Sequence, residues 1–156
     1  MLLEPAVADR LAGHDPRVVL DQSNLHAFCA ATEEVSHFLY LLFCARVARS
    51  VTQLELELQG EIDKYLVVLL FRGLEDEGAV SERLRQQLFE RYELVGGLSP
   101  ETSERYHEAS RLANRYCGWL ESRYLRRNRP EALARETRRF WRLGQREKLE
   151  TIAALQ

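Results

Sequence analysis

The sequence predicts an all-α protein, an up-and-down bundle of four long helices with one or two short helices beside it. Apolar residues recur at spacings of three and four along most of the chain, which is typical of helices that bury one face. The 156 residues include only 8 glycines and 4 prolines, few for a β protein built on turns. Serine, threonine and proline also stand where helices commonly begin.

Residues 1–22 are expected to form an N-terminal arm, and residues 23–156 a single helical bundle domain. A chain of this length is usually one domain. Within the arm, residues 5–12 can form a short helix that ends near Gly13, and Asp15-Pro16 predicts a turn or an extended dipeptide.

The next helix is expected to lie at the centre of the bundle. It begins at Ser23 or Asn24, either of which can cap it, and continues to about Arg49. Its segment 34–48 is apolar around most of the helix, so we expect this segment to be buried.

A break is expected after this helix. Thr52-Gln53-Leu54-Glu55 has the form of a capping box, which favours a new helix from 53 to about 72. The alternative is one continuous helix from 24 to 72.

Three further helices are expected. They begin after Ser81, at Pro100 and at Pro130, and they end before Gly96-Gly97, near Arg127 and near Ala154. Ser99 precedes Pro100 as a capping residue, and Gly144 is the weakest point of the last helix.

The cysteines and the hydropathy pattern favour a cytoplasmic protein. Cys29, Cys44 and Cys117 lack the spacing of a disulfide framework, and each lies among apolar residues, so we expect buried, reduced thiols. The first residues lack the basic and long apolar segments of a signal peptide. The apolar stretch 35–48 is too short to span a bilayer.

Charge is unevenly distributed along the chain. Residues 105–148 contain twelve arginines and one lysine against five acidic residues, a net charge of +8. Residues 1–104 contain nine basic and 18 acidic residues, a net charge of −9. The two parts are expected to face each other within the bundle or between subunits; the alternative is a surface that binds an anion.

An arginine stripe is expected on the last helix. The candidates for contact with an anion or a protein partner recur at three- and four-residue spacing: Arg135, Arg138, Arg142 and Arg146. Phe140 and Trp141 lie beside them, and arginines with aromatics suit phosphate contact and base stacking in nucleic-acid binding.

Polar residues inside the most apolar stretch need partners, because an unpaired buried polar group costs roughly 1–3 kcal/mol. In a tight antiparallel pair of the second and third helices, Tyr40 lies level with Asp63, and Arg46 lies level with Glu57. We therefore predict a buried Tyr40–Asp63 hydrogen bond and an Arg46–Glu57 ion pair.

Two motifs of the form Glu-x-x-His, Glu34–His37 and Glu104–His107, suggest a metal site. Each places a carboxylate and an imidazole one helical turn apart. The arrangement resembles the ferritin-like di-iron bundles, which combine two such motifs with one Glu from each of two other helices. The resemblance implies a di-metal centre.

A second resemblance rests on Glu33-Glu34-x-x-His37, followed on the next helix by Glu61 and Asp63. It is similar to the MazG-type all-helical nucleoside triphosphate pyrophosphatases. Those carry Glu-Glu-x-x-Glu on one helix and Glu-x-x-Asp on the next, and their acids hold Mg²⁺. Here His37 replaces the third acid, and Gly60 stands three residues before Asp63.

Two main classes of function follow. The favoured one is a non-enzymatic helical interaction module without a cofactor, which self-associates and docks a protein partner through an Arg-rich or acidic face. The alternative is a divalent-metal-dependent enzyme that uses Glu33, Glu34, His37 and Asp63. A further alternative is nucleic-acid binding through the basic C-terminal helices.

Overall fold

The computed structural model describes residues 3–72, 79–90 and 99–155, and in these ranges it is helical without strands. The predicted all-α class is therefore confirmed. The helices described are α1 (Pro5–Gly13), α2 (Leu25–Arg46), α3 (Gln53–Phe71), α4 (Ala79–Phe89), α5 (Pro100–Arg123), the 3₁₀ turn η1 (Leu125–Arg127), α6 (Pro130–Trp141) and α7 (Gln145–Ala153).

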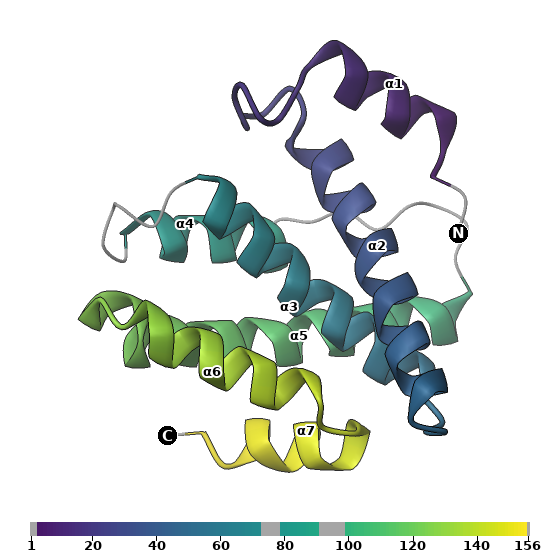
Figure 1. Cartoon of the computed structure of the whole chain (residues 1–156), viewed down its shortest axis with the longest axis vertical. Coiled ribbons are helices and arrows are strands. Elements are labelled where there is room, and N and C mark those ends of the chain that lie inside the picture. The colour runs from purple at the N-terminus through teal and green to yellow at the C-terminus, as the bar shows by residue number, and fades with distance from the viewer. Residues whose placement is uncertain (1–2, 73–78, 91–98, 156) are drawn as a thin grey trace.

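The core is built around α3 and α5, which lie side by side in the middle of the molecule (Figure 1). α4 packs against both helices, and α6 joins them through Phe140, whose ring stacks on Tyr116 of α5 at 4.0 Å between centroids. All three cysteines are buried and free, as expected. The fully buried side chains of the core include Leu58, Ile62, Tyr65, Leu84, Tyr116, Leu120, Phe140 and Ile152.

Most helices begin where the capping signals predict. The exception is the helix expected after Ser81: α4 begins at Ala79, so Ser81 lies inside it rather than before it. Thr52 Oγ1 accepts a hydrogen bond from the Glu55 backbone N–H at 3.1 Å, and α3 begins at the next residue. Ser99 Oγ accepts from the Thr102 N–H at 3.2 Å and opens α5. The predicted break between the second and third helices is therefore confirmed, and Ala48, at a positive φ of 51°, lies in the connection between them.

Three helix ends differ from the prediction, and one of them is that of α2, which ends at Arg46 rather than near Arg49. The expected helix over 130–154 is wrong, because the chain leaves the helical conformation after Trp141 and restarts at Gln145. Gly144 is the N-cap of the new helix, and its backbone N–H donates to Glu147 Oε2 at 3.0 Å. The helix expected over 100–127 ends at Arg123, and the separate 3₁₀ turn η1 follows it. The predicted end at Gly96-Gly97 lies outside the described residues.

These differences change the architecture. The C-terminal part consists of two shorter helices, and Figure 1 shows α7 turned back below α6. The arrangement of four long helices in an up-and-down bundle is accordingly not confirmed. None of the described helices is long and apolar enough to cross a membrane.

The expected burial of segment 34–48 is only half correct. α2 runs antiparallel to α3 and faces it with Ser36, Tyr40 and Cys44, which are buried. The opposite side remains exposed, with Phe38 and Leu39 each 50% accessible. The reason is that polar side chains of α2 find partners on α3, so the apolar ones are turned outward.

Removing the α3 cap should destabilise the fold. Thr52→Ala is expected to lower the free energy of unfolding by about 1 kcal/mol, because the Glu55 N–H loses its acceptor. Thr52→Ser keeps a hydroxyl and should remain close to the parent. Urea denaturation measures both variants. Equal stability of Thr52→Ala and the parent would contradict the role of this cap.

Candidate functional site

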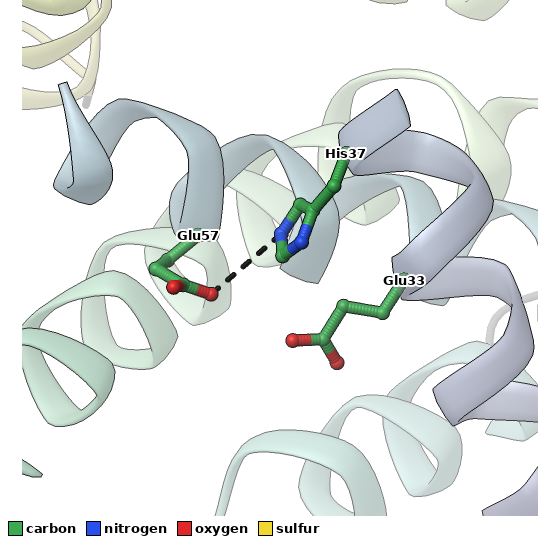
Figure 2. A group of neighbouring side chains, drawn as sticks. All are labelled: Glu33, His37 and Glu57. Atoms are coloured by element: carbon green, nitrogen blue, oxygen red, sulfur yellow. Dashed lines mark ion pairs between the residues drawn. The ribbon is translucent and has the colours of Figure 1, made fainter. Parts of the chain in front are cut away.

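A cluster of three titratable side chains lies between α2 and α3 (Figure 2). Glu33 and His37 project from successive turns of α2, and Glu57 approaches them from α3. His37 Nε2 and Glu57 Oε2 are 3.6 Å apart. One oxygen or nitrogen atom from each of the three residues lies within 4.8 Å of the others. We refer to these residues as the Glu33–His37–Glu57 cluster.

Gly60 makes room for the imidazole. A Cβ atom at this position would lie 2.7 Å from His37 Nε2 and 3.3 Å from Glu33 Cγ. Glycine inside a helix is destabilising by roughly 0.5–1 kcal/mol relative to alanine. Because position 60 has no Cβ, the imidazole can lie directly against the backbone of α3.

Two atoms of the cluster face each other without a hydrogen bond. Glu57 is only 7% exposed, and within the described part of the chain neither Glu57 Oε2 nor His37 Nε2 has a hydrogen-bond partner. Their separation of 3.6 Å exceeds the usual hydrogen-bond range of about 2.7–3.2 Å. Glu61 Oε2, one turn further along α3, is likewise buried without a partner among the described residues.

Cations lie at the edges of the cluster. Lys64 Nζ donates to Glu61 Oε1 at 2.7 Å and lies 3.5 Å from Glu33 Oε2. On the other side, Arg105 of α5 interacts electrostatically with Glu57. The carboxyl groups of Glu33, Glu57 and Glu61 therefore share two cationic neighbours, Lys64 and Arg105.

Burial sets the protonation of the cluster. The pKa of Glu57 is raised to about 7, mainly because the carboxyl group is buried and secondly because of the negative charge of Glu33. Arg105 and Tyr106 act to lower it. Burial also lowers the pKa of His37, against the opposite influence of Glu33 and Glu34. The imidazole is therefore more readily neutral than an exposed histidine, and the Glu57 carboxyl titrates near neutral pH.

The cluster contains two of the four metal ligands proposed from sequence. Glu33 and His37 belong to it, whereas Glu34 is exposed on another side of α2. The Asp63 carboxylate accepts hydrogen bonds from Ser36 Oγ at 2.7 Å and Gln59 Nε2 at 2.8 Å, so it is occupied elsewhere. Neither the di-iron nor the MazG-like ligand set is assembled as the resemblances implied.

The second Glu-x-x-His motif lies apart from the cluster. Glu104 and His107 are exposed in the first turns of α5, where they line a shallow surface depression with Leu54. Sequence reasoning did not propose Glu57 as a ligand, because its expected partner was Arg46. The signal that could have indicated Glu57 as a ligand is its i,i+4 spacing to Glu61, since this spacing places both carboxylates on one side of α3.

The predicted Tyr40–Asp63 hydrogen bond is wrong. The Tyr40 hydroxyl donates to Glu55 Oε1 at 2.6 Å and accepts from Arg49 Nη2 at 3.0 Å and Lys148 Nζ at 2.7 Å. The cause is the register of the two helices. α2 ends at Arg46, three residues earlier than expected, so its residues lie level with positions nearer the start of α3. The predicted Arg46–Glu57 ion pair is also wrong, because Arg46 is exposed and Glu57 lies beside His37 instead.

Lys148 of α7 is buried beneath this network. It donates to Tyr40 and, at 2.6 Å, to Gln59 Oε1, and it thereby links the C-terminal helix to the α2–α3 pair. No role was predicted for Lys148 from the sequence. The available signal was composition: the chain has 20 arginines but only two lysines, Lys64 and Lys148, and both lie in these polar networks.

The expected arginine stripe is interrupted. Arg135, Arg138, Arg142 and Arg146 are all exposed, but the break at Gly144 places Arg146 on a different helix from the first two. The neighbouring aromatics are also engaged. Phe140 is buried, and the Trp141 ring contacts those of Tyr40 and Phe43. These rings are therefore not presented for base stacking.

The chain matches no known protein family, no curated protein and no solved structure in comparisons with each. An imidazole nitrogen and two carboxylates are ligand types that zinc and other divalent transition metals accept.

Lys148 should make stability depend on pH. Burial lowers its pKa to about 7, so above this pH the folded protein has released a proton that the unfolded chain retains. The free energy of unfolding is therefore expected to rise from about pH 7 to about pH 9. Above that range the cysteine and tyrosine side chains, whose pKa values are raised by burial, oppose the trend.

Lys148→Met removes the titrating group and should flatten this rise, while Arg138→Met, at an exposed position, should leave it unchanged. Chemical denaturation at several pH values measures the effect. A rise of equal size in Lys148→Met and the parent would contradict the assignment.

Proposed function

We propose that the protein is a self-associating helical interaction module, in which two copies join through the outer face of α2. This outer face is the side of the helix that carries Val35, Phe38, Leu39 and Leu42. The observation that supports the proposal is their exposure: 45% for Val35, 50% for Phe38, 50% for Leu39 and 45% for Leu42. Single exposed apolar residues are common, but contiguous apolar patches of this kind mark interaction surfaces.

The spacing on the outer face suits helix packing. Positions 35, 38, 39 and 42 follow the i, i+3, i+4, i+7 pattern of a helix that packs against a neighbour. From Val35 to Ala45 the sequence contains no Asp, Glu, Lys or Arg. A partner helix on this face would therefore meet only apolar contacts along three turns.

The pattern favours a second copy of the chain as the occupant. A two-fold axis near the middle of this stretch places Val35 opposite Leu42 of the other copy, and Phe38 opposite Leu39. Such an isologous contact is self-complementary, and two-fold dimers are the commonest oligomers. Ala31 and Ala45, at the two ends of the same side, are small and permit close approach of the helices.

Exposed apolar side chains also lie at the end of α3. At the end of α3, Leu70 is 62% and Phe71 48% exposed, and the Phe71 ring packs against Phe28 of α2 at 4.7 Å between centroids. These two residues are separate from the four-residue outer face, which alone carries the proposal. We therefore propose the outer face of α2, rather than an Arg-rich or acidic surface, as the docking surface.

A charge on the outer face should dissociate the dimer. Phe38→Glu and Leu42→Glu each place a carboxylate in the proposed contact, where its desolvation would cost several kcal/mol. Both positions are half-exposed in the single chain, so its fold should be retained. We expect the parent to have the mass of two chains by light scattering, and both variants the mass of one.

Val18→Glu is the matched control, because Val18 is an apolar residue that is 84% exposed and lies outside α2. It should remain dimeric. A parent protein that is monomeric at every concentration tested, or a Phe38→Glu variant with unchanged mass, would refute the proposed interface. Far-UV circular dichroism confirms that each variant is folded.

A further inference from the structure

We propose that Glu33, His37 and Glu57 bind a single divalent transition-metal ion of the Zn²⁺ type between α2 and α3. This site lies on the inner side of α2 and is independent of the proposed dimer contact on its outer face. The ion would be held by Nε2 of His37 and one carboxylate oxygen from each glutamate.

The spacing of the ligand atoms fits one ion. Zinc lies about 2.0–2.2 Å from imidazole nitrogen and carboxylate oxygen, so two ligands of one ion are roughly 3–4 Å apart. The His37 Nε2–Glu57 Oε2 separation of 3.6 Å falls in this range. The atoms of all three residues already lie within 4.8 Å of one another, so binding requires only small side-chain rotations.

The unpaired buried atoms distinguish this cluster from ordinary acidic surface groups. Glu57 is more than nine-tenths buried, and in the described chain its Oε2 atom has no hydrogen-bond partner, nor does His37 Nε2. An unsatisfied buried polar atom is destabilising, because it has lost its hydrogen bonds to water without replacing them. An ion coordinated by both atoms would supply the missing partner to each.

Two neighbouring residues support the site. Gly60 leaves the space in which the imidazole lies, since a Cβ there would be 2.7 Å from Nε2. Lys64 forms its shorter ion pair with Glu61, at 2.7 Å, and is 3.5 Å from Glu33. The Glu33 carboxylate is therefore available to an ion while Lys64 keeps a partner.

The ligand types indicate the class of metal. Mg²⁺ and Ca²⁺ prefer six or more oxygen ligands, and an imidazole nitrogen is a poor ligand for them. One nitrogen and two carboxylate oxygens suit Zn²⁺, with a further position left for water. We infer selectivity for Zn²⁺ over Mg²⁺.

Zinc titration by calorimetry, on the full chain treated first with a chelator, tests the inference. We expect one Zn²⁺ per chain and no measurable heat with Mg²⁺. His37→Ala and Glu57→Gln should each weaken Zn²⁺ binding at least tenfold. The matched control is His26→Ala, which removes an exposed histidine of α2 outside the cluster, and it should bind like the parent.

Gly60→Ala keeps all three ligands but displaces the imidazole, so it should also weaken binding while the chain remains folded by circular dichroism. This variant preserves the test if the ligand substitutions impair folding. The absence of Zn²⁺ binding by the parent would overturn the proposal. So would unchanged affinity in His37→Ala and Gly60→Ala, because the ion would then be bound elsewhere. The native mass without metal tests the dimer separately.

Discussion

The antiparallel contact between α2 and α3 is made largely by polar side chains, and much of the remaining structure depends on it. Ser36 bonds Asp63, Tyr40 bonds Glu55, and Lys64 lies beside Glu33. Each of these interactions forms at only one relative level of the two helices, so together they specify the register. The apolar residues of α2 from Val35 to Leu42 are thereby directed away from the core, whereas Leu25 and Phe28 at its start are buried in it.

The apolar core and the polar α2–α3 contact have different roles: the core supplies most of the stability, and the polar contact specifies how the helices are arranged. Apolar burial is concentrated where α3, α4, α5 and α6 meet, around side chains such as Leu58, Tyr116 and Phe140. The polar layer contributes less to stability, because buried charges must be desolvated before they interact. Its networks instead connect distant parts of the chain. Lys148, for example, joins α7 to residues of α2 and α3, and the break at Gly144 allows α7 to turn toward them.

α2 consequently carries two surfaces of opposite character. Its inner side presents Glu33 and His37, which meet Glu57 of α3 in the cluster; Gly60 permits close approach there, and burial leaves two polar atoms unpaired. Its outer face presents apolar side chains at the spacing of a packing helix. The same amphipathic helix thus provides two of the three proposed metal ligands as well as the proposed dimer contact, and substitutions on either side can be made separately.

The sequence by itself determined where most helices begin, because capping depends on residues within one turn of each other. On this basis Thr52, Ser99 and Pro130 predicted the starts of α3, α5 and α6. The spacing of Glu33 and His37 likewise placed two residues of the cluster on one side of a helix. Only the tertiary structure decided the register that pairs Tyr40 with Glu55, the inclusion of Glu57, the position of Lys148 and the side of α2 that faces inward. These features depend on where α2 ends and on many contacts between distant residues, which local spacing does not encode.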